Sequence, residues 1–135
     1  MKILFVCKSN IGRSQIAEAF FNNLSKTHVA ISAGINAKDY SGRTIKELSD
    51  KVPRCMLEKG IDISEKLSKQ LTEELANQSN FVIWIAPEVK IPEFIDKNKL
   101  SLWDISDAGG KPYEHWCQAR DEIEKLVKNL IKDIE

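Results

Sequence analysis

The start of the chain combines an apolar run that ends in a cysteine, a five-residue loop and a helical pattern. Lys2–Val6 is predicted to be a short buried strand, and Cys7 follows directly at its end. From Ile16 to Leu24, apolar residues recur at helical spacing, and Ser14 is the expected N-cap. A strand, a tight loop and a helix in this order open a βαβ unit, which favours a parallel sheet.

The predicted loop has the properties of an anion-binding site. Backbone N–H groups of such a loop point inward, and the helix N-terminus adds partial positive charge. Arg13 supplies a guanidinium fork that can grip two oxygens of an oxyanion. The same donors stabilise negative charge on the Cys7 sulfur, so we expect a thiolate nucleophile inside an oxyanion cradle. The loop residues expected to bind the oxyanion are Lys8, Ser9, Asn10, Ile11, Gly12 and Ser14.

The rest of the chain continues to alternate between strands and helices. Further strands are predicted at His28–Ser32, Asn80–Ala86 and Leu100–Trp103, with the strongly apolar Asn80–Ala86 at the centre of the sheet. Helices or helical turns are predicted at Thr44–Ser49, from Pro53 as first helical residue to a stop at Gly60, from Thr72 to Gln78, at Pro92–Asp96 and at Tyr113–Glu135. This alternation predicts an α/β fold in one domain over residues 1–135.

The last predicted helix is amphipathic. Its apolar face carries Trp116, Ile123, Leu126, Val127, Leu130, Ile131 and Ile134. The side chains expected on its solvent side are Arg120, Asp121, Glu124, Lys125 and Lys128. The apolar face is the part of this helix that should pack on the core.

Composition argues against several classes of protein. Twenty basic and twenty acidic residues leave no net charge, so nothing favours a nucleic-acid or membrane partner. The apolar start of the chain is too short for a signal peptide or a membrane span, and we expect a cytoplasmic protein. Cys7, Cys55 and Cys117 are odd in number and widely spaced, which argues against a disulfide framework. Cys55 and Cys117 are expected to be packing residues.

Displacement of an alcohol or phenol from phosphorus requires a proton for the leaving oxygen. Asp104 and Asp107 both follow a predicted strand, in a glycine-containing loop at the edge of the sheet where Cys7 lies. An aspartate in a loop is also a common turn-former. These considerations leave the choice between the two carboxyl groups open.

The segment Cys7-Lys-Ser-Asn-Ile-Gly-Arg-Ser14, which continues into Gln-Ile-Ala-Glu-Ala, resembles the low-molecular-weight protein tyrosine phosphatase family. The arsenate reductases of the same fold belong to that superfamily. Ile31–Gly34, Gly60–Ser64, Phe81–Ile85 and Trp103–Asp107 follow in the family's order. The resemblance implies a four-stranded parallel sheet flanked by helices, with the phosphate loop between strand 1 and helix 1. It also implies a two-step reaction through a phosphocysteine, with no metal and no cofactor.

The resemblance assigns roles to single residues. Cys7 is the expected nucleophile and Arg13 the group that binds the oxyanion. The Ser14 hydroxyl is expected to support the thiolate. Asn10 is expected to brace the loop, with Ser32 as its support.

By its position, Asp107 corresponds to the family's general acid, which protonates the leaving oxygen and then activates water. Three departures from the family's pattern accompany it. Ala108 replaces the usual proline, so the loop loses a fixed φ. Gly12 stands where many members carry a second cysteine. No aromatic residue follows Asp107 directly, and Tyr40 or Tyr113 is the candidate to replace it.

The predicted function is that of a cysteine-dependent phosphomonoesterase of the protein tyrosine phosphatase type. Its expected ligands are a phosphorylated protein or a small phosphomonoester, and oxyanions such as phosphate, sulfate or arsenate. The alternative is an arsenate reductase. Because Phe81–Ile91 contains no resolving cysteine, it would require an external thiol such as glutathione, or Cys55 or Cys117 if either reaches the site. A phosphocysteine carrier or an anion-binding module is a second alternative.

Overall fold

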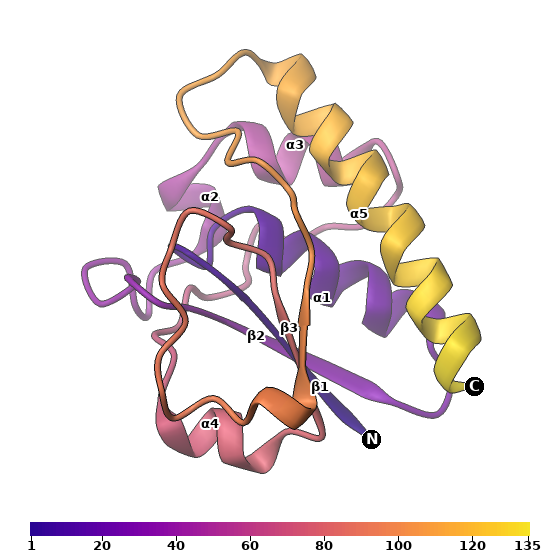
Figure 1. Ribbon diagram of the computed structural model, residues 1–135. Helices are drawn as coiled ribbons and strands as arrows, with labels where there is room; N and C mark the ends of the chain where they lie inside the picture. The colour runs from indigo at the N-terminus through magenta and orange to yellow at the C-terminus, as the bar shows by residue number, and fades with distance from the viewer.

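The computed structural model describes residues 1–135 and contains a four-stranded parallel sheet (Figure 1). The strands are β1 (Lys2–Cys7), β2 (Val29–Gly34), β3 (Phe81–Trp84) and β4 (Leu100–Leu102). Their order in the sheet is β2-β1-β3-β4, and every pairing is parallel. The predicted parallel α/β architecture is confirmed, and β3 is an inner strand as expected.

Helices cover both faces of the sheet (Figure 1). The helices are α1 (Arg13–Leu24), α2 (Ile45–Leu48), α3 (Lys51–Leu57), α4 (Glu73–Gln78) and α5 (Tyr113–Ile134), with the 3₁₀ helix η1 (Lys97–Lys99) before β4. On one face α1 packs against α5, and α3 contacts α5 as well. On the other face lies α4. None of the helices combines the length and the apolar composition that a membrane-spanning helix requires.

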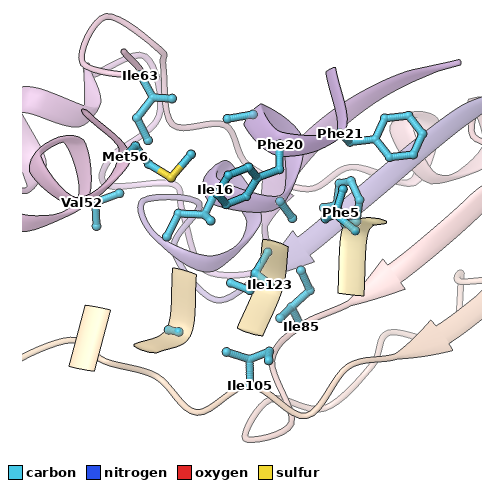
Figure 2. Close-up of a cluster of buried hydrophobic side chains, with 14 of the residues drawn as sticks. Phe5, Ile16, Phe20, Phe21, Val52, Met56, Ile63, Ile85, Ile105 and Ile123 are labelled. Atoms are coloured by element: carbon cyan, nitrogen blue, oxygen red, sulfur yellow. The ribbon is translucent and has the colours of Figure 1, made fainter. Parts of the chain in front are cut away.

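The apolar run of β1 is explained by burial on both faces. Ile3 and Phe5 belong to the larger hydrophobic cluster, between the sheet and α1, α3 and α5. Leu4 and Val6 point to the opposite face and belong to the cluster that α4 covers. Phe5 meets Phe21 of α1 edge to face, with 6.0 Å between the ring centroids (Figure 2). An inner parallel strand needs apolar side chains at successive positions, and this places Cys7 at the carboxyl edge of the sheet.

Three expectations about secondary structure and burial were wrong. Pro53 is the third residue of α3 rather than the first, although it still lies in the first turn, where a missing N–H costs little. Pro92–Asp96 forms turns rather than a helix, and Ile95 is buried there against the smaller cluster. Arg120 is 6% exposed rather than solvated, because its guanidinium reaches across to α3.

Candidate active site

Loop 8–12 connects β1 to α1 and forms the floor of a cavity of about 370 Å³. Cys7 lies in this cavity, at the end of β1. Leu48 and the following residues 49–51 line it, and so does Asp107. Trp116 from the start of α5 also lines the cavity. Residues that are far apart in sequence therefore surround one thiol.

Ser14 contacts the nucleophile candidate directly. Its Oγ lies 2.9 Å from Sγ of Cys7, and it accepts a hydrogen bond of 2.8 Å from Nδ2 of Asn10. Because the Asn10 amide donates to Ser14, the hydroxyl proton of Ser14 is free to point at the sulfur. Ser14 is not the N-cap of α1, contrary to expectation. Gly12 occupies that position without a side-chain cap.

Asn10 holds the loop in a conformation that few residues adopt. Its φ is 56°, and no other residue apart from glycine has a positive φ. Its Nδ2 also donates to Oγ of Ser32 at 2.9 Å, and its Oδ1 accepts from the backbone N–H of Lys69 at 2.8 Å. Ser32 in turn donates to Oε1 of Glu18 at 2.9 Å. The structure thus brings together Asn10 and Ser32, the pair expected to brace the loop, and adds the buried Glu18 behind them.

Arg13 is oriented by an acidic residue that the sequence analysis missed. Its two terminal nitrogens bind the two carboxylate oxygens of Glu88 at 3.0 and 2.5 Å, and one of them also donates to the carbonyl oxygen of Ile105 at 2.8 Å. Glu88 follows β3 at the same edge of the sheet as Cys7, and this position was the available signal. The pair fixes the plane of the guanidinium beside the thiol.

The charges in this part of the site reinforce one another. Burial disfavours the charged form of Arg13, but the hydrogen bond to Glu88 and the nearby Cys7 and Asp107 outweigh it and raise the pKa of Arg13. The hydrogen bond from Arg13 lowers the pKa of Glu88. Arg13, which is 3% exposed, is therefore a permanent positive charge next to the sulfur.

The structure separates the two aspartates that the sequence left as alternatives. Asp107 lines the cavity that contains Cys7, whereas Asp104 lines two other hollows and does not reach this one. One carboxylate oxygen of Asp107, Oδ1, accepts from the backbone N–H of Gly109 at 2.9 Å. Asp107 is exposed, so its carboxyl group has access both to a ligand in the cavity and to water.

An aromatic side chain does reach the cavity, but it is neither Tyr40 nor Tyr113. Both tyrosines lie outside it, and Trp116 lines it instead. A Cβ on Gly12 would lie 2.3 Å from Cη2 of Trp116, so the indole ring fills the space that a side chain at position 12 needs. The sequence offered only a weak signal for this, a tryptophan in the first turns of the last helix.

The other two cysteines are remote from the cavity. Cys55 is fully buried, its Sγ donates to the carbonyl oxygen of Val52 at 3.2 Å, and burial raises its pKa to about 12. Cys117 lies on α5, with its Sγ 3.8 Å from Oε2 of Glu58. Neither lines the cavity that contains Cys7. No group of three or more His, Cys, Asp or Glu side chains is arranged to hold a metal ion.

In the parallel sheet, β1 ends at Cys7, and loop 8–12 connects it to α1, which begins at Arg13. This arrangement defines a class of phosphate-binding enzymes with a thiol at the centre of the site. Within that class, residues 2–135 match the family model for low molecular weight phosphotyrosine protein phosphatase, and the chain belongs to this family.

Relatives from two kinds of enzyme match nearly the whole chain. An arsenate reductase of Staphylococcus aureus (strain Newman) is 30% identical over 131 residues, which are 95% of this chain and 94% of the relative. The YwlE arginine phosphatase from Geobacillus stearothermophilus is 30% identical, with a TM-score of 0.84 over 98% of this chain and 92% of that one. A structure of an arsenate reductase in the phosphate binding state is 28% identical, with a TM-score of 0.84 over 99% and 98% of the two chains.

Proposed function

We propose that this protein is a phosphomonoesterase that acts through a phosphocysteine on Cys7. Arg13 binds the phosphoryl oxygens with the two N–H donors that Glu88 and Ile105 leave free, on Nε and Nη2, and Asp107 is the general acid and base. The observation that carries the proposal is that the ends of β1 and α1 and the loop after β4 place Cys7, Arg13 and Asp107 around one cavity. A thiol, a fixed guanidinium and an accessible carboxyl group are the three groups that this chemistry needs.

In the first step the Cys7 thiolate attacks phosphorus, a sulfur–phosphorus bond forms, and the bond to the leaving oxygen breaks. Asp107 gives its proton to that oxygen, so an alcohol or phenol leaves rather than an anion. The Ser14 hydroxyl, 2.9 Å from Sγ, stabilises the thiolate before the attack. Arg13 and the N–H groups of loop 8–12 hold the phosphoryl oxygens as charge develops on them.

In the second step the Asp107 carboxylate takes a proton from water, and the resulting nucleophile attacks the phosphocysteine. The sulfur–phosphorus bond breaks, phosphate leaves, and the thiolate returns to its hydrogen bond with Ser14. A solved YwlE arginine phosphatase supports this intermediate by analogy, because its C7S mutant carries a phosphorylated active site serine. That chain is 26% identical, with a TM-score of 0.84.

The walls of the cavity favour a substrate with an apolar group next to the phosphate. Ile11, Leu48 and Trp116 provide apolar surface around the thiol. We therefore propose aryl phosphomonoesters, either small molecules or phosphorylated side chains of proteins, as the substrate class. A working thiolate is best preserved in a reducing compartment, so the cytoplasm is the proposed location.

The proposal is tested with two variants and an aryl phosphate. Cys7→Ser is expected to abolish turnover while phosphate binding, measured by calorimetry, remains. Asp107→Asn is expected to lower turnover about a hundredfold or more, because a general acid contributes on that scale. Asp104→Asn is the matched control and should retain wild-type turnover. Unchanged turnover in Cys7→Ser would contradict the proposal.

Arsenate reduction is the second candidate function, favoured by the arsenate reductases among the relatives. Cys7 would displace an oxygen of arsenate, and a second thiol would then attack Sγ, forming a disulfide and releasing arsenite. Cys55 and Cys117 do not line the cavity, so that thiol has to be an external one, such as glutathione. The test is arsenite production with several added thiols. An absence of arsenite with all of them would exclude this function.

A phosphocysteine carrier fits the site less well, because a carrier has no use for the accessible carboxyl group of Asp107. Trapping of the phosphocysteine in a single turnover distinguishes an enzyme from a module that only binds anions.

A further inference from the structure

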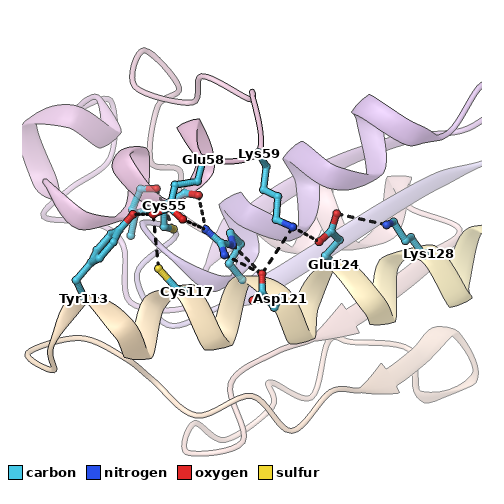
Figure 3. Close-up of polar contacts among 10 residues, drawn as sticks. Cys55, Glu58, Lys59, Tyr113, Cys117, Asp121, Glu124 and Lys128 are labelled. Carbon is cyan, nitrogen blue, oxygen red and sulfur yellow. Dashed lines mark hydrogen bonds and ion pairs between the residues drawn. The ribbon is translucent and has the colours of Figure 1, made fainter.

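Helix α3 presents a polar stripe to the end of loop 104–112 and to the start of α5. The stripe consists of Lys51, Arg54 and Glu58, which recur at the spacing of a helix face. The three side chains make successive contacts with residues 111–120. Figure 3 shows the far end of this contact zone, where Glu58 faces Tyr113 and Cys117.

Each residue of the stripe contacts a different group of Lys111 or Tyr113. Lys51 Nζ donates to the carbonyl oxygen of Lys111 at 2.8 Å. The guanidinium carbon of Arg54 lies 4.0 Å from the centroid of the Tyr113 ring, in a cation–π contact. Glu58 accepts a hydrogen bond from the Tyr113 hydroxyl.

A short series of hydrogen bonds connects Lys51 to the proposed acid. The backbone N–H of Lys111 donates to the carbonyl oxygen of Ala108 at 3.1 Å, and that of Gly109 donates to Asp107 at 2.9 Å. The loop from Asp107 to Lys111 is therefore a pair of turns, and Lys51 holds its outer end. Ala108, 4% exposed, anchors its inner end in the core.

The loop itself has little intrinsic rigidity. Gly109 and Gly110 are adjacent, Gly110 has a φ of 78°, and residue 108 is an alanine without the fixed φ of a proline. A loop of this composition needs external contacts to keep a carboxyl group in one place. Lys51, which makes such a contact, lines the same cavity as Asp107.

We propose that Lys51 is a positioning residue for Asp107, with Arg54 and Glu58 as its support on α3. The inference rests on the proposed function, since it assumes that Asp107 protonates the leaving oxygen. Proton transfer requires the Asp107 carboxyl group within hydrogen-bond reach of the leaving oxygen. Movement of loop 104–112 therefore slows only those substrates whose leaving oxygen needs a proton.

The test is a comparison of kcat/KM for two substrates. Dinitrophenyl phosphate releases an anion that is stable without a proton, whereas phenyl phosphate releases a phenol with a pKa of about 10. In Lys51→Met, kcat/KM for phenyl phosphate is expected to fall roughly tenfold more than that for dinitrophenyl phosphate. This tenfold difference is a part of the rate enhancement that a general acid contributes. Both substrates carry the same phosphate group, so any effect of the lost charge on binding acts on both alike, and kcat/KM for each reports the steps from binding up to release of the leaving group.

Two further variants complete the design. Lys51→Arg keeps a charged donor and is expected to restore most of the ratio between the two substrates. Lys128→Met removes an exposed lysine that pairs with Glu124, far from the cavity, and should leave both values unchanged. An equal decrease for both substrates in Lys51→Met, or no decrease, would overturn the positioning role. A wild-type protein without turnover of either substrate would overturn the proposed function and this inference with it.

Discussion

The indole ring of Trp116 lies against Gly12 so closely that neither position is independent of the other. A Cβ on Gly12 would lie 2.3 Å from Cη2 and 2.5 Å from Cζ3 of Trp116. Gly12 is also the N-cap of α1 and part of the cradle around Cys7. The start of α5 therefore determines which residue loop 8–12 accepts at position 12.

Gly12→Ala is expected to destabilise the protein and to displace the loop. Overpacking of a filled site costs about 1–3 kcal/mol. Here the added Cβ would meet the rigid indole ring of Trp116 rather than the end of a flexible side chain. Urea unfolding measures the loss. In a Trp116→Phe background the ring is smaller, so the same substitution should cost clearly less. An equal cost in both backgrounds would contradict the coupling.

Peroxide treatment is expected to oxidise Cys7 without forming an internal disulfide. Position 12 is a glycine, Cys55, with a pKa of about 12, is buried away from the cavity, and Cys117 does not line it either. Peptide mapping by mass spectrometry should find sulfenic acid or its higher oxides on Cys7, and mixed disulfides when an external thiol is present. A peptide pair linked through Cys7 and Cys55 or Cys117 would disprove the arrangement.

The ion pair between Glu88 and Arg13 is expected to make stability depend on pH in the acid range. Because the pKa of Glu88 is lowered in the folded protein, its contribution is complete above the ordinary value of 4.5 and is lost as pH falls through the folded value. Glu88→Gln lacks this contribution. The difference in unfolding free energy between wild type and Glu88→Gln should therefore be largest near neutral pH and shrink below about pH 4.5. Exposed Glu114→Gln serves as the control. A difference that does not vary with pH would count against the pair.

Arg120→Met is expected to lower the free energy of unfolding by about 1–3 kcal/mol, since it leaves a buried acceptor without a donor. Arg120 donates to the carbonyl oxygen of Cys55 at 2.8 Å, one of the last carbonyls of α3. It also contacts Glu58 at 3.2 Å. Lys125→Met, on the exposed side of the same helix, should change stability by less than about 0.5 kcal/mol. Equal effects of the two substitutions would mean that Arg120 has no structural role.

The sheet and the position of the thiol were predictable from the sequence because they depend on local patterns. Parallel strands that are buried on both faces are near-continuous apolar runs, and the segments at Lys2–Val6 and Asn80–Ala86 have this composition. The residues of loop 8–12 that are proposed to bind the oxyanion belong to one contiguous motif, so they could be named from the sequence. Asp107 could be placed at the correct edge of the sheet, but its separation from Asp104 depends on how loop 104–112 turns.

The features that the sequence did not predict depend on contacts between distant segments. Arg120 lies beside the polar face of α5, and only the position of α3 makes it buried. Glu88 gains its role from Arg13, which is 75 residues away in sequence. The sequence around Lys51 and Trp116 does not indicate a place at the site, and only the packing of α3 and α5 brings these residues to the cavity. In Pro92–Asp96 the burial of Ile95 outweighs local helix propensity.

The strand order has a consequence for how the protein folds. β1 pairs with β2 through the short α1 crossover, so the β1–α1–β2 unit can form early, through contacts that are close in sequence. Ile3 can pair with Phe81 only after a much longer segment has found its place, and Trp116 arrives later still. Loop 8–12 also depends on the contact of Asn10 with Lys69, and Arg13 depends on Glu88. During refolding, the proposed oxyanion binding is therefore expected to return only after β3 has paired with β1, and not with the early β1–α1–β2 unit.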